Sequence, residues 1–107
     1  TEEHLHFHAA LLSRCPSAWT RRVIDELAQH AQRYGLLGAQ KYRHGRGPRA
    51  EHAALRDAAL AGDVKRAVVL LEEHLRRTLD SVRAALADAS ADAAPGPAAT
   101  KKRRRAR

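Results

Sequence analysis

The sequence predicts an all-α protein, an antiparallel bundle of about four helices followed by a disordered C-terminal tail. Apolar residues recur every three or four positions through most of the chain. Aromatic residues make up only 4% of the 107 residues, and the alternating β-branched runs typical of strands do not occur. A chain of this length forms one small domain, with or without a tail. We assign the bundle to residues 1–88 and the tail to residues 89–107.

The first two helices are predicted on either side of a proline. The first covers about residues 2–13 and ends before Cys15-Pro16, because proline disfavours a helical conformation in the residue before it. The second is expected to start at Pro16 and to fray near Gly35 or Gly38. One side of the first helix carries Leu5, His8, Leu11 and Leu12. The apolar stripe of the second comprises Trp19, Val23, Leu27, Ala31 and Tyr34.

The last two helices are predicted to form a tight hairpin. A Gly- and Pro-containing loop at 43–49 leads into a third helix at about 48–61. Gly62 is placed as its C-terminal stop, and Asp63 as the N-cap of a fourth helix at about 64–88. The fourth helix has the clearest apolar stripe, which we expect to pack in the core: Val64, Val68, Leu71, Leu75, Leu79, Val82 and Leu86.

The strong positive charge belongs to the tail. The chain holds 20 Lys and Arg against 12 Asp and Glu, a net charge of +8. The basic residues of segment 101–107 form a polybasic run, and such a run gives non-specific, salt-sensitive contacts to phosphates. The alternative is a solvated tail without a dedicated partner. The candidate nucleic-acid contacts are Lys101, Lys102, Arg103, Arg104, Arg105 and Arg107.

Several other classes of protein are disfavoured. The longest aliphatic run, residues 67–71, is far too short to span a membrane, and no signal peptide is recognisable. A single cysteine, Cys15, cannot form an internal disulfide, which fits a reducing cytoplasm. We find no phosphate-binding loop and no nucleophile paired with a base, and we expect Glu51 to point away from the neighbouring histidines. The chain is therefore not expected to be an enzyme.

Seven histidines are the strongest chemical signal. His4 and His8 lie four residues apart, so on a helix they share a face, whereas His6 points to the far side. His52 falls on the packing side of the third helix, and His74 at the edge of the apolar stripe of the fourth. A buried imidazole needs a partner, either a hydrogen-bonding group or a shared metal ion. His30 and His44 are not paired with another histidine in this way and are expected to be ordinary surface residues. The metal hypothesis joins His4, His8, His52 and His74.

Three segments resemble, in order, the motifs of one bacterial family. Phe-His-Ala-Ala-Leu-Leu at residues 7–12 resembles the D-x-x-F-H-x-x-L helix of the C-terminal, FCD-type effector-binding domain in GntR-family regulators of the FadR-like branch. Residues 51–63 resemble the E-H-x-x-I-x-x-A-I-x-x-G-D segment of that domain. Residues 67–75 resemble the A-x-x-x-x-x-x-H-L that follows. The resemblance covers about residues 2–86, and its middle motif is the specific one.

The resemblance implies a ligand-sensing domain of a cytoplasmic transcription regulator. In this family a bundle of six or seven helices holds a divalent metal through one Asp and three His, and the metal captures a small organic acid. A separate winged helix-turn-helix domain binds operator DNA as a dimer. By position, His8, His52 and His74 match the family histidines, and His4 stands where the family has Asp.

That departure changes the expected metal. Four imidazoles favour Zn²⁺, with Ni²⁺ or Cu²⁺ as alternatives, over Mg²⁺ or Mn²⁺. The alternative is that His4 does not bind and the site is degraded. The winged helix domain and the first helices of the sensor domain have no counterpart here, so we expect a piece of a longer regulator whose uncovered apolar faces favour a homodimer.

The residues alone are compatible with two other functions. One is a small helical nucleic-acid-binding or scaffolding protein that acts through its basic tail. The other is a metalloenzyme, which would need a carboxylate or another base at catalytic spacing from the histidines. The sequence shows no such group, so the sensor of a metal and a small carboxylate is the function that it favours.

Overall fold

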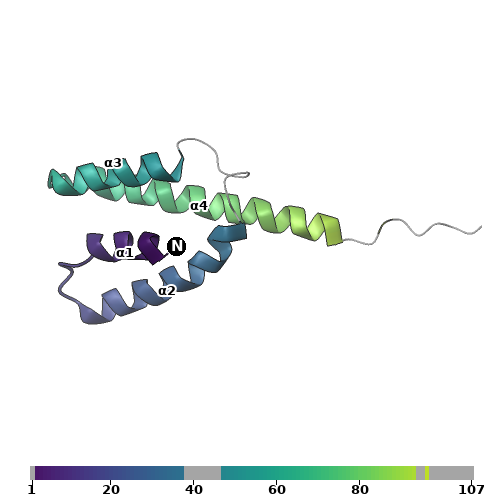
Figure 1. Cartoon of the computed structure of the whole chain (residues 1–107), viewed down its shortest axis with the longest axis horizontal. Coiled ribbons are helices and arrows are strands. Elements are labelled where there is room, and N and C mark those ends of the chain that lie inside the picture. Colours follow the sequence, from purple (N-terminus) through teal and green to yellow (C-terminus); the bar gives the residue numbers. More distant parts are fainter. Residues whose placement is uncertain (1, 38–46, 94–95, 97–107) are drawn as a thin grey trace, which may run out of the picture.

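A computed structural model of the chain describes residues 2–37, 47–93 and 96 (Figure 1). Those residues form four helices and no strand, which confirms the predicted all-α class. The helices are α1 (Glu2–Leu11), α2 (Ala18–Leu37), α3 (Pro48–Leu60) and α4 (Val64–Ala93). His44 and the basic run 101–107 lie outside the described residues. Within the described part, no helix has the length and apolar character needed to cross a membrane.

Three helix boundaries differ from the predicted ones. α1 ends at Leu11 rather than near residue 13. α2 begins at Ala18 rather than Pro16, because the Ser17 hydroxyl accepts a hydrogen bond from the Thr20 backbone N–H at 3.1 Å and so caps the helix. α4 continues to Ala93, so residues 89–93, which we had placed in the tail, are helical. The alanines of this segment have high helix propensity, which explains the extension.

The α3–α4 turn forms as predicted. Gly62 adopts a left-handed φ of +69°, a conformation that glycine reaches without steric cost. The backbone N–H groups of Gly62 and Asp63 donate to the carbonyls of Ala59 and Ala58, the two bonds of a Schellman motif. The Asp63 carboxylate then accepts from the Arg66 backbone N–H at 3.0 Å and caps α4. This turn sets α3 antiparallel to α4 (Figure 1).

The four helices form two hairpins that lie side by side. Figure 1 shows α1 with α2 in one hairpin and α3 with α4 in the other. α3 packs most extensively against α4, and α4 also contacts α2. The apolar core between them is small: in the described part of the chain, Leu55 and Ala58 are the buried hydrophobic residues, whereas Glu51, His74 and Ser81 are buried polar ones. The interior is therefore built around polar side chains.

The prediction that the long apolar stripe of α4 forms the core is wrong for this chain. Leu75 is 56% exposed and Val64 is 71% exposed, whereas His74 is buried. The face of α4 that meets the other helices carries His74, Thr78 and Ser81, whose polar groups are hydrogen-bonded. On α2, Trp19, Leu27 and Tyr34 are likewise exposed. The stripe residues that face outward on α4 are Val64, Val68, Leu75, Leu79 and Leu86.

Candidate metal centre

Four imidazoles from three helices meet at one point. His4 and His8 come from α1, His52 from α3 and His74 from α4, and their candidate ligand atoms all lie within 4.8 Å of one another. The Nε2 atoms of His4 and His8 are 3.1 Å apart. Those of His52 and His74 are 3.3 Å apart. The structure therefore brings together the four residues that the sequence singled out.

The position of each ring follows from local geometry. On α1 the four-residue spacing places His4 and His8 on one face, where their rings meet edge to face with centroids 4.7 Å apart. In the α3–α4 hairpin, the Gly62 turn places His52 and His74 at similar heights, because they lie ten residues before and twelve residues after it. Their ring centroids are 4.6 Å apart. The two hairpins thus contribute two imidazoles each.

The spacing of the nitrogens fits a transition-metal ion. Zn–N bonds of about 2.0–2.1 Å in a tetrahedron place neighbouring nitrogens about 3.3 Å apart. The two measured Nε2–Nε2 distances, 3.1 and 3.3 Å, agree with that value. The remaining separations extend up to 4.8 Å, so a tetrahedral ion would draw the two hairpins slightly closer together.

Burial and the neighbouring imidazoles lower the pKa of one candidate ligand, His8. The pKa of His8 is lowered from 6.5 to about 4, first by burial and then by the neighbouring His4, His74 and His52. His8 is therefore neutral at physiological pH, the form in which an imidazole nitrogen can donate its lone pair to a metal.

Glu51 belongs to the site, contrary to our expectation that it would point elsewhere. Its carboxylate oxygen Oε2 lies 2.7 Å from His74 Nδ1, and its Oε1 accepts a hydrogen bond from Arg77 at 3.0 Å. The signal was present in the sequence: Glu51, Leu55 and Ala58 are spaced by four and three residues, so they share the buried face of α3. We had expected Glu51 to point elsewhere only because it is adjacent to His52 in the chain.

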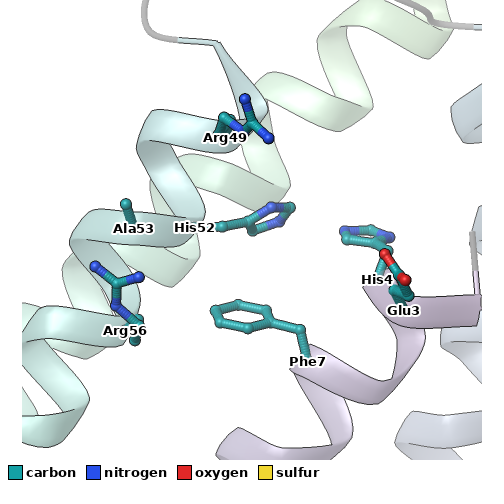
Figure 2. Close-up of a pocket in the computed structure, with 7 residues that line it drawn as sticks. All are labelled: Glu3, His4, Phe7, Arg49, His52, Ala53 and Arg56. Atoms are coloured by element: carbon teal, nitrogen blue, oxygen red, sulfur yellow. The ribbon is translucent and has the colours of Figure 1, made fainter.

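An open pocket adjoins the cluster (Figure 2). Its volume is about 510 Å³, and it lies between the N-terminal parts of α1 and α3. The centroids of the Phe7 and His52 rings are 5.0 Å apart. Arg56 forms an ion pair with the Asp57 carboxylate, with Nη2 and Oδ1 2.9 Å apart. The lining residues are Glu3, His4, Phe7, Arg49, His52, Ala53 and Arg56.

The other histidines of the described part stay outside the cluster, as expected. His6 is exposed and lies 4.0 Å from the Glu2 carboxylate, one turn earlier on α1. His30 is exposed on α2. Neither residue belongs to the cluster of four converging rings.

Comparison with known proteins places the chain in a family. Residues 1–77 match the FCD domain family. Over 77 residues the chain is 44% identical to a protein of Paraburkholderia xenovorans (strain LB400) described as an uncharacterized HTH-type transcriptional regulator BphR. The match covers 72% of this chain and 31% of that relative, so the chain spans about a third of the relative's length. No solved structure matches significantly. The matched segment contains all four converging histidines, and the chain belongs to the FCD domain family.

Proposed function

We propose that this chain is the effector-sensing part of a GntR-family transcription regulator, and that it binds a divalent metal through His4, His8, His52 and His74. The observation that carries the proposal is the convergence of four imidazoles from three helices in a chain of the FCD family. The metal and a small organic acid would together bias operator binding by a winged helix domain elsewhere in the regulator, in the bacterial cytoplasm. We assign no catalytic step to the site.

The donor set favours Zn²⁺, with Ni²⁺ as the next candidate. Imidazole nitrogens suit these ions, whereas Mg²⁺ and Mn²⁺ prefer oxygen ligands. His4 stands where the family has a carboxylate, so a dication on four neutral imidazoles would keep its full charge. An uncompensated dication attracts an anionic effector more strongly than a site that already holds a carboxylate.

The pocket beside the cluster supports a small carboxylate as the effector. It is lined by His4 and His52, so a ligand in the pocket can approach an ion held by these rings. Arg49 supplies positive charge for a carboxylate, whereas Arg56 is paired with Asp57, and Phe7 supplies an apolar surface for a carbon skeleton. Arg49 and Phe7 are the residues that we expect to contact the acid.

A second copy of the chain is the proposed occupant of the exposed stripe of α4. Val64, Val68, Leu75, Leu79 and Leu86 follow a spacing of three or four residues once the half-buried Leu71 and Val82 are included. Such a continuous apolar seam along a long helix is typical of helix pairing between chains. Dimerisation would also match operator binding by two winged helix domains.

The direct experiment measures metal and effector binding on the chain. We expect Zn²⁺ to copurify with the wild type and to be lost from His52→Ala and His74→Ala, while the exposed His30→Ala retains it. A small carboxylate at about 100 times its Kd should stabilise the metal-loaded chain by about 2.7 kcal/mol. Equal metal content in the wild type and both cluster variants would refute the site, and the absence of a thermal shift across a panel of organic acids would refute the sensor.

A further inference from the structure

We propose that Glu51 is a positioning residue of the metal centre, which holds His74 in the tautomer and orientation that direct Nε2 towards the other three imidazoles. The observation is a buried carboxylate that joins a candidate ligand to a cation. Glu51 Oε2 lies 2.7 Å from His74 Nδ1, and Arg77 donates to Oε1 at 3.0 Å. The inference rests on the metal binding proposed above.

The hydrogen bond determines which nitrogen of His74 carries the proton. An ionised carboxylate only accepts hydrogen bonds, so the Nδ1 atom that faces Glu51 must hold the hydrogen. In the neutral ring Nε2 is then left with its lone pair, and this atom faces His52 Nε2 at 3.3 Å. The carboxylate thereby selects the tautomer in which His74 presents a metal-binding atom to the cluster.

Burial makes this contact selective. The side chains of Glu51 and His74 are 5% and 6% exposed, so water does not compete effectively for the shared hydrogen bond. A carboxylate in the interior is costly unless its charge is compensated. Arg77 provides that compensation from the next turn of α4, on the same helix as His74. Carboxylate and ring are thus held from two helices at once.

The arrangement connects the surface of α4 to the cluster. Arg77 also lies 3.7 Å from the half-exposed Glu73 carboxylate, one turn earlier on α4. The order is Glu73, Arg77, Glu51 and His74, and each contact fixes the orientation of the next side chain. Carboxylates that orient metal-bound histidines typically change metal affinity by about 10–100-fold when they are replaced. We expect an effect of this size for Glu51.

Glu51→Gln tests this role on the whole chain, with two readouts. Gln keeps the shape of the side chain but carries no charge and brings an amide NH₂ that Arg77 cannot pair with. Competition with a chromogenic chelator should show Zn²⁺ affinity reduced by about 10–100-fold. In the metal-free protein, ¹⁵N-detected NMR of the imidazoles should show His74 as the Nδ1–H tautomer in the wild type and as a mixture in the variant. The matched control is Glu72→Gln, an exposed glutamate of α4, which should leave both readouts unchanged.

The outcomes separate this inference from the proposed function. If the wild type binds no Zn²⁺, the proposed function fails, and a metal role for Glu51 fails with it. If the wild type binds Zn²⁺ and Glu51→Gln binds it equally tightly, the positioning role alone is overturned. A single unchanged His74 tautomer in Glu51→Gln would overturn it as well, and this measurement does not require metal.

Discussion

The inner face of α4 is polar and buried, whereas its outer face is aliphatic and exposed. The inner face carries His74 and Ser81, which are 5% and 2% exposed, and the outer face carries aliphatic side chains that are 45–71% exposed. Globular proteins usually bury the aliphatic face and expose the polar one. The polar face of α4 is internal because its groups are hydrogen-bonded to neighbouring side chains and carbonyls. The contrast is what the proposed functions require, with a polar interior for the proposed metal and an apolar outer face for the proposed association with a second chain.

The largest difference should appear when a leucine of the buried interior, Leu55 on α3, and a leucine of the outer face of α4, Leu75, are truncated. Leu55→Ala removes a side chain that is 2% exposed and should lower the free energy of unfolding by about 3 kcal/mol. Leu75→Ala removes one that is 56% exposed and should cost less than about 1 kcal/mol in the monomer. Urea unfolding at low protein concentration provides the comparison. Equal losses for the two variants would show that the outer face is buried in solution.

The outer face should control self-association. Leu75→Glu together with Leu79→Glu places two charges on the exposed stripe and should abolish the dimer, because burying unpaired charges at an interface is costly. The helical content should be retained. Sedimentation equilibrium over a range of concentrations gives the mass directly. A wild-type chain that stays monomeric at high concentration would eliminate the proposed interface.

The histidine cluster that the inner face of α4 contacts should make the free energy of unfolding depend on pH through His8 of α1. The pKa of His8 is about 4 in the folded chain and 6.5 as its ordinary value, so between these limits the unfolded chain binds more protons. The contribution of His8 to the free energy of unfolding is therefore constant above pH 6.5. Below this value the free energy of unfolding falls as the pH drops from 6.5 towards 4. His8→Gln should flatten this part of a plot of unfolding free energy against pH in the metal-free protein. An unchanged slope would show that His8 is not shielded from protons.

Removal of the tail should have the smallest effect on the helical part of the chain. Removal of residues 101–107 should weaken non-specific DNA binding and make it less salt-dependent, because six basic side chains are lost. Zn²⁺ affinity should not change. Fluorescence anisotropy with DNA of unrelated sequence, at two salt concentrations, measures the first effect. Loss of Zn²⁺ binding after this deletion would contradict the separation of tail and metal centre.

The features predicted correctly from the sequence depend on short-range rules. The Gly62 stop and the Asp63 cap follow from backbone preferences within a few residues, and both formed as expected. His4 and His8 were paired by helical spacing. The meeting of these two with His52 and His74 was a tertiary expectation, supported by the family resemblance as well as by the packing faces.

The features that were missed depend on partners that a sequence does not reveal. The stripe of α4 was placed in the core because apolar periodicity shows that a face needs a partner, but not which partner covers it. Glu51 was expected to point away from the histidines because it directly precedes His52 in the chain, whereas the structure shows it on the buried face of α3, where an uncompensated carboxylate is unfavourable. It is tolerated because Arg77, 26 residues later, lies opposite it in the α3–α4 hairpin. The charge compensation becomes visible only when the two helices are placed together.

X-ray absorption spectroscopy of the Zn²⁺-loaded chain tests the proposed metal centre most directly. We expect a first shell of nitrogen ligands at about 2.0–2.1 Å, with the outer-shell scattering pattern of several imidazoles. His4→Ala should remove one imidazole from that pattern and leave the other three, since the remaining rings come from separate positions on α1, α3 and α4. A first shell dominated by oxygen, with no imidazole scattering, would contradict binding of the ion by the four converging histidines.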